Sequence, residues 1–280
     1  MRSGKIIIAV FTGTGNTLLM AEALSGELRS AGKDVSLAPM ERPEIFESCL
    51  KELGNEAALG LAVPVACFST YPTAWRFIDS LPEGRGREIF LLATMGGAGG
   101  GMEGPIRRAV TRKGYVPIGS LLVRMPGNYG NKTIDTSKNK KMESDARAEI
   151  QKYAKMLLDG SAAWGGGVPL ASRLLASLAH GRKPWNLFHS MFPIEALAEK
   201  CTGCGLCQRI CPEGNITMEG GRASLGPNCE SCQRCVAFCR SGAICVPARP
   251  AARYAGSPLD SILRLIREAG ETEEAGKSCP

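Results

Sequence analysis

The sequence contains no run of about 18 apolar residues, the length that a helix needs to cross a bilayer. No apolar signal segment opens it. Histidine is nearly absent, and His180 and His189 are the only two in the sequence. Neither has neighbouring residues in a pattern that indicates a role. No proton-relay or nucleophile constellation appears. These absences predict a cytoplasmic protein with no transmembrane segment, in which bound cofactors supply the chemistry.

A basic stripe interleaved with aromatic residues, which nucleic-acid binding needs, is also missing. The one dense lysine run, Lys138 to Lys141 with Lys132 nearby, contains no aromatic residue. We interpret it as a solvated loop. The sequence therefore does not predict a nucleic-acid partner.

Cysteine, in contrast, is abundant, and eight of the 12 cysteines lie between Cys201 and Cys239. The spacing C-x2-C-x2-C-x3-C occurs there twice, with the second copy 28 residues after the first. Three thiolates at this spacing can wrap one face of an iron-sulfur cube. The fourth cysteine, three residues further on, is expected to start a helix that points away and to ligate the other cube.

The two ligand sets therefore cross over between the copies. One [4Fe-4S] cluster is assigned to Cys201, Cys204, Cys207 and Cys239, and the second to Cys211, Cys229, Cys232 and Cys235. The run resembles the two-cluster bacterial-type ferredoxins, and Cys211-Pro212 matches their usual C-P ending. Cys239 departs from that pattern because Arg240 follows it.

Two other interpretations of the cysteines are weaker. A disulfide framework needs an oxidising compartment, and these cysteines cluster rather than scatter. Structural zinc prefers paired C-x2-C knuckles separated by a longer loop. Formal net charge is +7. Since each cube with four thiolates carries about −2, the loaded protein falls to about +3, and the basic excess largely balances the clusters.

A chain of 280 residues is too long for one ferredoxin module of roughly 50 to 60 residues, so a second core is expected upstream. Lys5 to Phe11 is a short β-branched run typical of a buried parallel strand. A Gly/Thr loop follows, and then a segment with helical spacing that ends at Gly32. Such a loop places backbone amides at a helix N-terminus, where a phosphate is favoured.

The identity of the phosphate depends on what the loop lacks. A Walker A lysine is absent, and Leu18 stands where the dinucleotide fingerprint needs its third glycine. A single monophosphate bound by neutral donors fits best. The loop closely resembles the phosphate loop of flavodoxins, and the resemblance implies that it holds the phosphate of FMN. The residues concerned are Thr12, Gly13, Thr14, Gly15, Asn16 and Thr17.

Strands and helices alternate through the rest of the first 160 residues. Further strands are expected at Asp34–Ala38, Ala57–Val65, Glu88–Ala93 and Ser120–Met125, and further helices at Pro43–Leu53, Trp75–Leu81, Ile106–Lys113 and Glu143–Leu158. The alternation predicts an α/β domain with a doubly wound five-stranded parallel sheet and ligands at the carboxyl ends of its strands. The flavodoxin resemblance implies the strand order 2-1-3-4-5.

Loops after the third and fourth strands should contact the flavin ring. In flavodoxin-like proteins these positions enclose the isoalloxazine, which implies stacking by Phe68 or Tyr71 and backbone hydrogen bonds from Gly96 to Gly99. The candidates in these loops are Val65, Phe68, Thr70, Tyr71, Thr94, Met95, Gly96, Gly97 and Gly99. An aromatic residue beside prolines is more often a packing residue. Cys67 is interpreted as a small loop residue, although a thiol beside a flavin could react.

The predicted organisation has four parts: a flavodoxin-like domain at 1–160, a linker at 161–197, a smaller α+β ferredoxin domain at 198–247, and a tail at 248–280 that contains one helix, Leu259–Glu268. The linker carries an amphipathic helix from Leu170 to Leu178 and aromatic residues. It could touch a membrane surface, but packing between the two domains is the favoured interpretation.

Together the two halves resemble the flavodoxin-plus-ferredoxin fusion proteins of anaerobic bacteria and archaea. The resemblance implies a protein that passes electrons between FMN and two [4Fe-4S] clusters, and so links two-electron and one-electron carriers. The redox partner proteins, and any oxidoreductase substrate, are not named by the sequence. In the alternative, the first domain is an empty docking module, and the chain is a tethered two-cluster ferredoxin or a redox sensor.

Overall fold

The computed structural model describes residues 1–54, 56–97, 101–128, 135–165, 185, 189–190, 193–247 and 253–267. Its larger part is a five-stranded parallel sheet in the order β2-β1-β3-β4-β5. The strands are β1 (Lys5–Val10), β2 (Asp34–Pro39), β3 (Ala58–Pro64), β4 (Glu88–Met95) and β5 (Val116–Arg124). The order is the flavodoxin-like one, and it confirms the predicted fold class.

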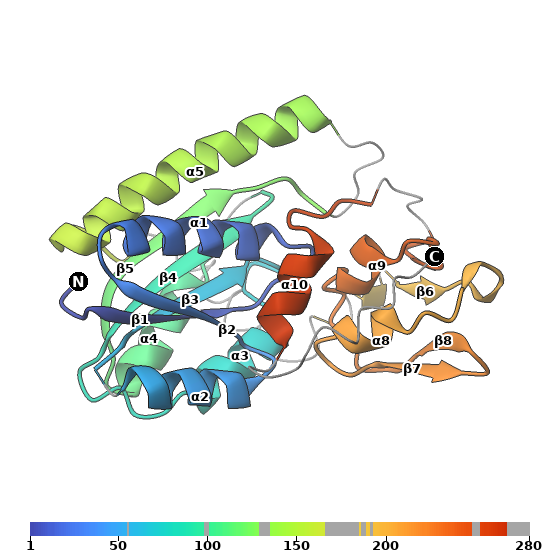
Figure 1. Ribbon diagram of the computed structural model, residues 1–280, viewed down its shortest axis with the longest axis horizontal. Helices are drawn as coiled ribbons and strands as arrows, with labels where there is room; N and C mark the ends of the chain where they lie inside the picture. The colour runs from blue at the N-terminus through green and yellow to red at the C-terminus, as the bar shows by residue number, and fades with distance from the viewer. Residues whose placement is uncertain are drawn as a thin grey trace.

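Helices cover both faces of the sheet (Figure 1). One face is packed by α1 (Asn16–Ser30) and α5 (Thr136–Asp159), and the other by α2 (Pro43–Leu53), α3 (Pro72–Ser80) and α4 (Glu103–Arg112). The central residues of the three inner strands are almost all apolar because both faces of these strands are buried. This arrangement leaves only the strand ends for a ligand.

The helix and strand starts differ from expectation at several places. β5 begins at Val116 rather than Ser120, and α5 begins at Thr136 rather than Glu143. The α5 start is explained by Asp135, whose side chain accepts a hydrogen bond from the backbone amide of Lys138 at 2.9 Å and so caps the helix. The lysine run is therefore helical, and its interpretation as a loop is wrong.

A smaller domain lies beside the carboxyl end of the sheet (Figure 1). It contains two short antiparallel pairs, β6 with β9 and β7 with β8. Its elements are β6 (Glu195–Ala196), a 3-10 turn (Ala198–Lys200), α8 (Leu206–Ile210), β7 (Ile216–Glu219), β8 (Arg222–Leu225), α9 (Arg234–Phe238) and β9 (Ile244–Cys245). It has its own core, in which Ile194, Ile216 and Ile244 pack against cysteine side chains.

The last described element, α10 (Leu259–Ile266), returns to the first domain. Its buried residues Ile262 and Leu265 join the core formed by α1, α5 and the sheet. The tail is thus part of the first domain's packing, which its position after the ferredoxin domain does not indicate. The amphipathic linker helix expected at 170–178 lies outside the described residues. No helix in the described ranges combines the length and the apolar character that crossing a membrane requires.

Candidate functional site: a strand-end cavity beside two cysteine groups

The Gly/Thr loop joins β1 to α1 as predicted. Gly15, at the start of α1, has φ +100°, which favours glycine, and its backbone amide donates to the Thr12 hydroxyl at 3.2 Å. Among the described residues, no acceptor is present for the backbone amides of Thr14, Asn16 and Thr17. These amides are the donors that an anion at a helix N-terminus would engage.

A cavity of about 850 Å³ opens at the carboxyl ends of β1, β3, β4 and β5, within the size range of cofactor sites. Of the residues predicted to bind the cofactor, it brings together Thr12, Gly13, Thr14, Asn16, Thr17, Val65, Tyr71, Thr94, Met95, Gly96 and Gly97. Gly15, Phe68 and Thr70 do not line it, and Gly99 lies outside the described residues. The structure therefore collects segments from four separate loops into one hollow.

Hydrogen bonds tie these loops together. The hydroxyls of Thr17 and Thr94 are 2.8 Å apart, and the backbone amide of Val65 donates to the Thr94 carbonyl at 2.8 Å. The side-chain amide of Asn128, after β5, donates to the Thr14 hydroxyl at 3.2 Å. The phosphate-loop threonines thus brace neighbouring loops, a role that the spacing alone does not indicate.

The two candidate aromatic residues lie in different environments. Tyr71 is buried, with its ring 5.3 Å from that of Phe11 and 4.8 Å from that of Trp185, although it also lines the cavity. Phe68 is 54% exposed. It follows Cys67 in a tight turn in which both residues have positive φ, 49° and 60°. Stacking on a flavin ring remains a prediction for both aromatic residues.

Cys67 lines the cavity within this turn. The turn is closed by hydrogen bonds between the backbones of Ala66 and Ser69, at 2.9 and 2.8 Å. A positive φ at two successive residues other than glycine is strained, and such strain is concentrated at functional sites. Burial raises the pKa of the Cys67 thiol to about 11, so the thiol is neutral near pH 7.

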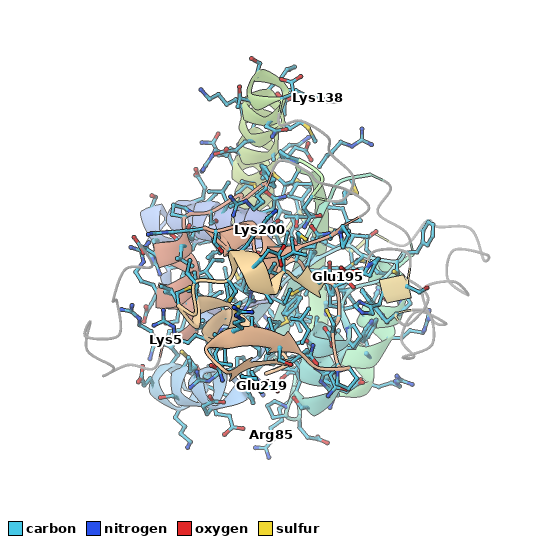
Figure 2. The ribbon with its side chains drawn as sticks, turned by 90° about the vertical axis from the view of Figure 1, so that its right-hand side faces the viewer. Lys5, Arg85, Lys138, Glu195, Lys200 and Glu219 are labelled. Carbon is cyan, nitrogen blue, oxygen red and sulfur yellow. The ribbon has the colours of Figure 1, made fainter. Side chains whose placement is uncertain are left out.

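The first turns of α5 also reach the cavity, and the sequence did not predict this. Asp135, Lys138, Asn139 and Met142 contribute to its wall. Seen from the ferredoxin end, Lys138 stands on the end of α5 that projects beyond the rest of the fold (Figure 2). The lysine run thus borders the mouth of the cavity. The end of β5 and the segment that follows it, Arg124 to Asn128, line the cavity as well.

Residues 253–258, here called the C-terminal strap, cross the outer side of the phosphate loop. The backbone amide of Gly256 donates to the Thr14 carbonyl at 2.6 Å, and the Ser257 hydroxyl donates to the Gly15 carbonyl at 2.8 Å. A Cβ on Gly15 would stand 2.4 Å from the backbone nitrogen of Ser257. Gly15 is therefore required by this packing as well as by its φ.

Asn16 is held at both ends of its side chain. Its Oδ1 accepts a hydrogen bond from the Tyr254 hydroxyl at 2.7 Å, and its Nδ2 donates to the Pro126 carbonyl at 2.9 Å. Burial raises the pKa of Tyr254 to about 12, so the donating hydroxyl persists through the neutral range. Nothing local in the sequence indicates a contact between residues this far apart.

Four of the cysteines line one small cavity in the second domain. They are Cys211, Cys229, Cys232 and Cys235, the set that crosses between the two copies. Apolar and polar side chains line the rest of its wall: Ile194, Pro212, Glu213, Asn215, Ile216, Leu225, Glu230 and Gln233. The grouping agrees with the second predicted ligand set.

The other four cysteines form a second group. Without iron, burial and, after it, the nearby thiols of Cys239, Cys204 and Cys201 raise the pKa of the Cys207 thiol to about 11. Cys204 is exposed, whereas Cys232 and Cys235 are buried. The first set therefore lies nearer to solvent than the second.

The fourth cysteine of each copy ends a helix instead of starting one, which corrects the prediction. Cys211 follows α8 and Cys239 follows α9, and both have extended backbones. Pro212 disfavours a helical backbone at Cys211. The backbone amide of Asn215 donates to the Cys211 sulfur at 3.3 Å, and such hydrogen bonds tune cluster potentials.

The duplication extends to backbone conformation. Gly203 and Gly205 in the first copy have φ of 74° and 70°, and their equivalents 28 residues later, Ser231 and Gln233, have φ of 54° and 61°. The second copy therefore keeps a geometry suited to glycine without having glycine. A positive φ is strained at residues other than glycine, yet the second copy keeps it. This indicates that the two cysteine loops enclose similar clusters.

The side-chain spacing also bears on zinc. In the described part of the chain, no three His, Cys, Asp or Glu side chains converge closely enough to hold a single metal ion. A cube binds its thiolates at separate iron corners, so its ligands stand further apart than those of one zinc ion.

The 4Fe-4S dicluster domain family matches residues 194–243, which contain all eight cysteines. The ferredoxin-like protein in the nif region of Sinorhizobium fredii is 34% identical over 59 residues, covering 19% of this chain and 92% of that protein. This chain belongs to the 4Fe-4S dicluster ferredoxin family, fused to a flavodoxin-like domain. The predicted combination of a flavodoxin-like domain with a two-cluster ferredoxin domain is thereby confirmed. Two [4Fe-4S] clusters are cofactors of this fusion protein.

Solved structures similar to the fusion protein include flavodoxins. One from the domain Archaea is 20% identical, covering 55% of this chain and 99% of that chain with a TM-score of 0.40. The two-electron reduced flavodoxin of Megasphaera elsdenii is 22% identical, covering 51% of this chain and 98% of that chain with a TM-score of 0.37. The flavodoxin-like assignment depends on the strand order of the fusion protein itself.

The two domains also meet through α3. The Arg76 guanidinium pairs with Glu213 and, at 3.2 Å, with Glu230. The Thr73 hydroxyl donates to Glu230 at 2.8 Å. Burial and the neighbouring Glu213 carboxylate raise the pKa of Glu230 to about 7. A ring of polar contacts thus fixes the cluster-binding domain against the sheet domain.

Proposed function

We propose that the fusion protein transfers electrons between FMN and its two [4Fe-4S] clusters. When bound, FMN exchanges two electrons with a hydride-level carrier and single electrons with the clusters, whereas each cluster takes one. The two electrons that a bound flavin could supply would match one electron for each cluster. Redox proteins that donate and accept these electrons are the expected partners.

The residues of the strand-end cavity suit FMN. The backbone amides of Thr14, Asn16 and Thr17 would hold its phosphate, because they are donors without an acceptor at a helix N-terminus. Val65, Thr94 and the backbone of Gly96 and Gly97 would face the ring. Tyr71 and Met95, which also line the cavity, would close it around the cofactor.

One contact carries the proposal. The carbonyl oxygen of Cys232 lies 2.1 Å from where a Cβ on Gly13 would stand, so a ligand loop of the second cluster touches the phosphate loop. The two cofactor sites are therefore neighbours within one chain. The exposed Cys204 places the first cluster within reach of an external one-electron partner.

The test is cofactor content after purification without oxygen. We expect about eight irons, from two four-iron clusters, and about one FMN per chain. Replacing both Thr14 and Thr17 by alanine should release FMN and leave the iron content unchanged, whereas Thr111→Ala, on the exposed side of α4, should change neither. Eight irons without flavin, even after FMN is added, would contradict the proposal. The first domain would then be a docking module for a tethered ferredoxin.

A further inference from the structure

Arg234 belongs to the second domain but contacts the phosphate loop of the first. Its Nε and Nη2 donate to the Thr12 carbonyl at 3.1 and 2.7 Å. Its Nη1 donates to the Ile210 carbonyl at 3.1 Å, immediately before the cluster ligand Cys211. One guanidinium therefore joins the backbone that leads into the phosphate loop to the backbone that carries a cluster ligand.

This guanidinium is fully enclosed. Arg234 is 1% exposed, its Nη1 is 2.6 Å from the Glu41 carboxylate after β2, and its charge lies 5.8 Å above the centre of the Phe11 ring. A buried charge of this kind requires all of its partners, and the planar fork of arginine can reach several of them at once. Lysine offers a single ammonium group and could not do so.

The contact acts on the conformation of the phosphate loop. Thr12 is the first threonine of the loop, and its hydroxyl accepts the Gly15 amide that starts α1. The next residue, Gly13, lies against the Cys232 carbonyl. The orientation of the loop at Thr12 and Gly13 therefore depends on residues 232 and 234, which lie within the loop that carries predicted ligands of the second cluster.

We propose that Arg234 is a positioning residue of the flavin phosphate loop, and that FMN binding and occupation of the second cluster are thereby coupled. The inference builds on the proposed function, since it assumes that FMN binds in the strand-end cavity. Coupling between two sites is reciprocal, so an intact second cluster strengthens FMN binding, and bound FMN strengthens the binding of that cluster by the same factor at equilibrium. Coupled sites typically change one another's affinity by about 5- to 150-fold.

The experiment measures the Kd of FMN by quenching of its fluorescence, without oxygen, on full-length protein. Cys211→Ala removes a ligand of the second cluster and should raise this Kd at least about fivefold. Cys239→Ala is the matched control, because it removes a ligand of the first cluster and should leave the Kd nearly unchanged. Iron content is measured on each sample.

Arg234→Lys should weaken FMN binding by about tenfold, since it loses the paired donation to Thr12. Arg76→Met, which disrupts the other domain contact at α3, should have little effect on the Kd. If Arg234→Lys does not fold, the double variant Arg234→Met with Glu41→Leu is used in its place. It removes both buried charges together, so neither is left without its partner. As a second readout, FMN should slow iron transfer to a chelator in the wild type and not in the Arg234 variants.

Equal FMN affinity in the wild type, Cys211→Ala and the Arg234 variants would overturn the coupling and leave the proposed function intact. Equal weakening by Cys211→Ala and Cys239→Ala would also overturn it, because loss of either cluster would then act through general loosening of the domain. Failure of the wild type to bind FMN at all would overturn both proposals, and this outcome is distinct from the other two.

Discussion

Gly13 and Cys232 are in direct contact, since a Cβ on Gly13 would stand only 2.1 Å from the Cys232 carbonyl oxygen. The neighbour is backbone and cannot rotate away. Gly13 was expected to allow a phosphate to approach, but its absent side chain makes room for the second domain. The loop that suits a flavin phosphate is thus also the surface on which the cluster domain sits.

Gly13→Ala should therefore lower the stability of the loaded protein. Forcing one extra carbon against backbone costs about 1–3 kcal/mol, and we expect a lower midpoint of thermal unfolding. Gly97→Ala is the control in the same cavity, because no atom of the described residues lies within 4 Å of its added Cβ. Equal midpoints for the two variants would contradict the contact between Gly13 and the Cys232 backbone.

The crossed ligand sets can be tested by mapping thiols. In Cys211→Ala, the iron content should fall by half, and alkylation should reach Cys229, Cys232 and Cys235. In Cys239→Ala, alkylation should instead reach the three remaining members of the first set, Cys201, Cys204 and Cys207. The physical reason is that a cube missing one thiolate is lost, and it frees its other ligands.

Peptide mass spectrometry after anaerobic labelling gives the answer directly. Cys245, which lies just after the clusters in β9, serves as an internal control that should be labelled to the same extent in both variants. Labelling of Cys201, Cys204 and Cys207 in the Cys211→Ala protein would show instead that each copy binds its own cluster.

The sequence predicted the parts of this molecule whose information is local. The β-branched run of β1, the Gly/Thr turn and the repeated cysteine spacing each specify their own structure over a few residues. The strand order followed from the resemblance of the loop to that of flavodoxins. The fold class and the two clusters could therefore be predicted before any coordinates.

Contacts between distant segments could not be predicted in this way. Arg234 lies between cluster ligands, where a charged residue is expected to face solvent, and its partner Glu41 is far away in the sequence. The strap residues Tyr254 and Ser257 carry no motif either. Their roles appear only when α10 has packed against the first domain, because that packing carries the strap across the phosphate loop.

Cys67 should react slowly with iodoacetamide at neutral pH. Burial raises the pKa of its thiol to about 11, so the neutral form dominates below that pH, and the labelling rate should rise about tenfold per unit between pH 8 and 10. Because Cys67 lines the cavity, saturating FMN should slow its labelling at every pH.

Cys49 in α2 is the comparison residue. Burial raises the pKa of its thiol as well, but it does not line the flavin cavity, so FMN should leave its labelling rate unchanged. Rates are read from the two peptides in the same digest. Protection of both thiols by FMN, or of neither, would place the flavin elsewhere than between the loops after β3 and β4.

Tyr254→Phe should weaken FMN binding although Tyr254 does not line the cavity. The variant loses the hydrogen bond to Asn16, which is worth about 1 kcal/mol, and frees the residue at the start of α1 to reorient. We expect a lower unfolding free energy and an FMN Kd that rises several-fold. Tyr115→Phe is the matched control, since its hydroxyl contacts Arg87, away from the phosphate loop.

The pH dependence of stability tests the burial of the Tyr254 hydroxyl at this contact. The pKa of Tyr254 is raised from 10 to about 12 in the folded protein, so the folded state holds this proton more tightly than the unfolded state does. The resulting stability is complete below pH 10 and is lost as pH rises toward 12. The stability advantage of the wild type over Tyr254→Phe should therefore shrink from pH 10 upward, as measured by urea unfolding at each pH. An advantage that stays constant from pH 8 to 11 would contradict the burial of the Tyr254 hydroxyl.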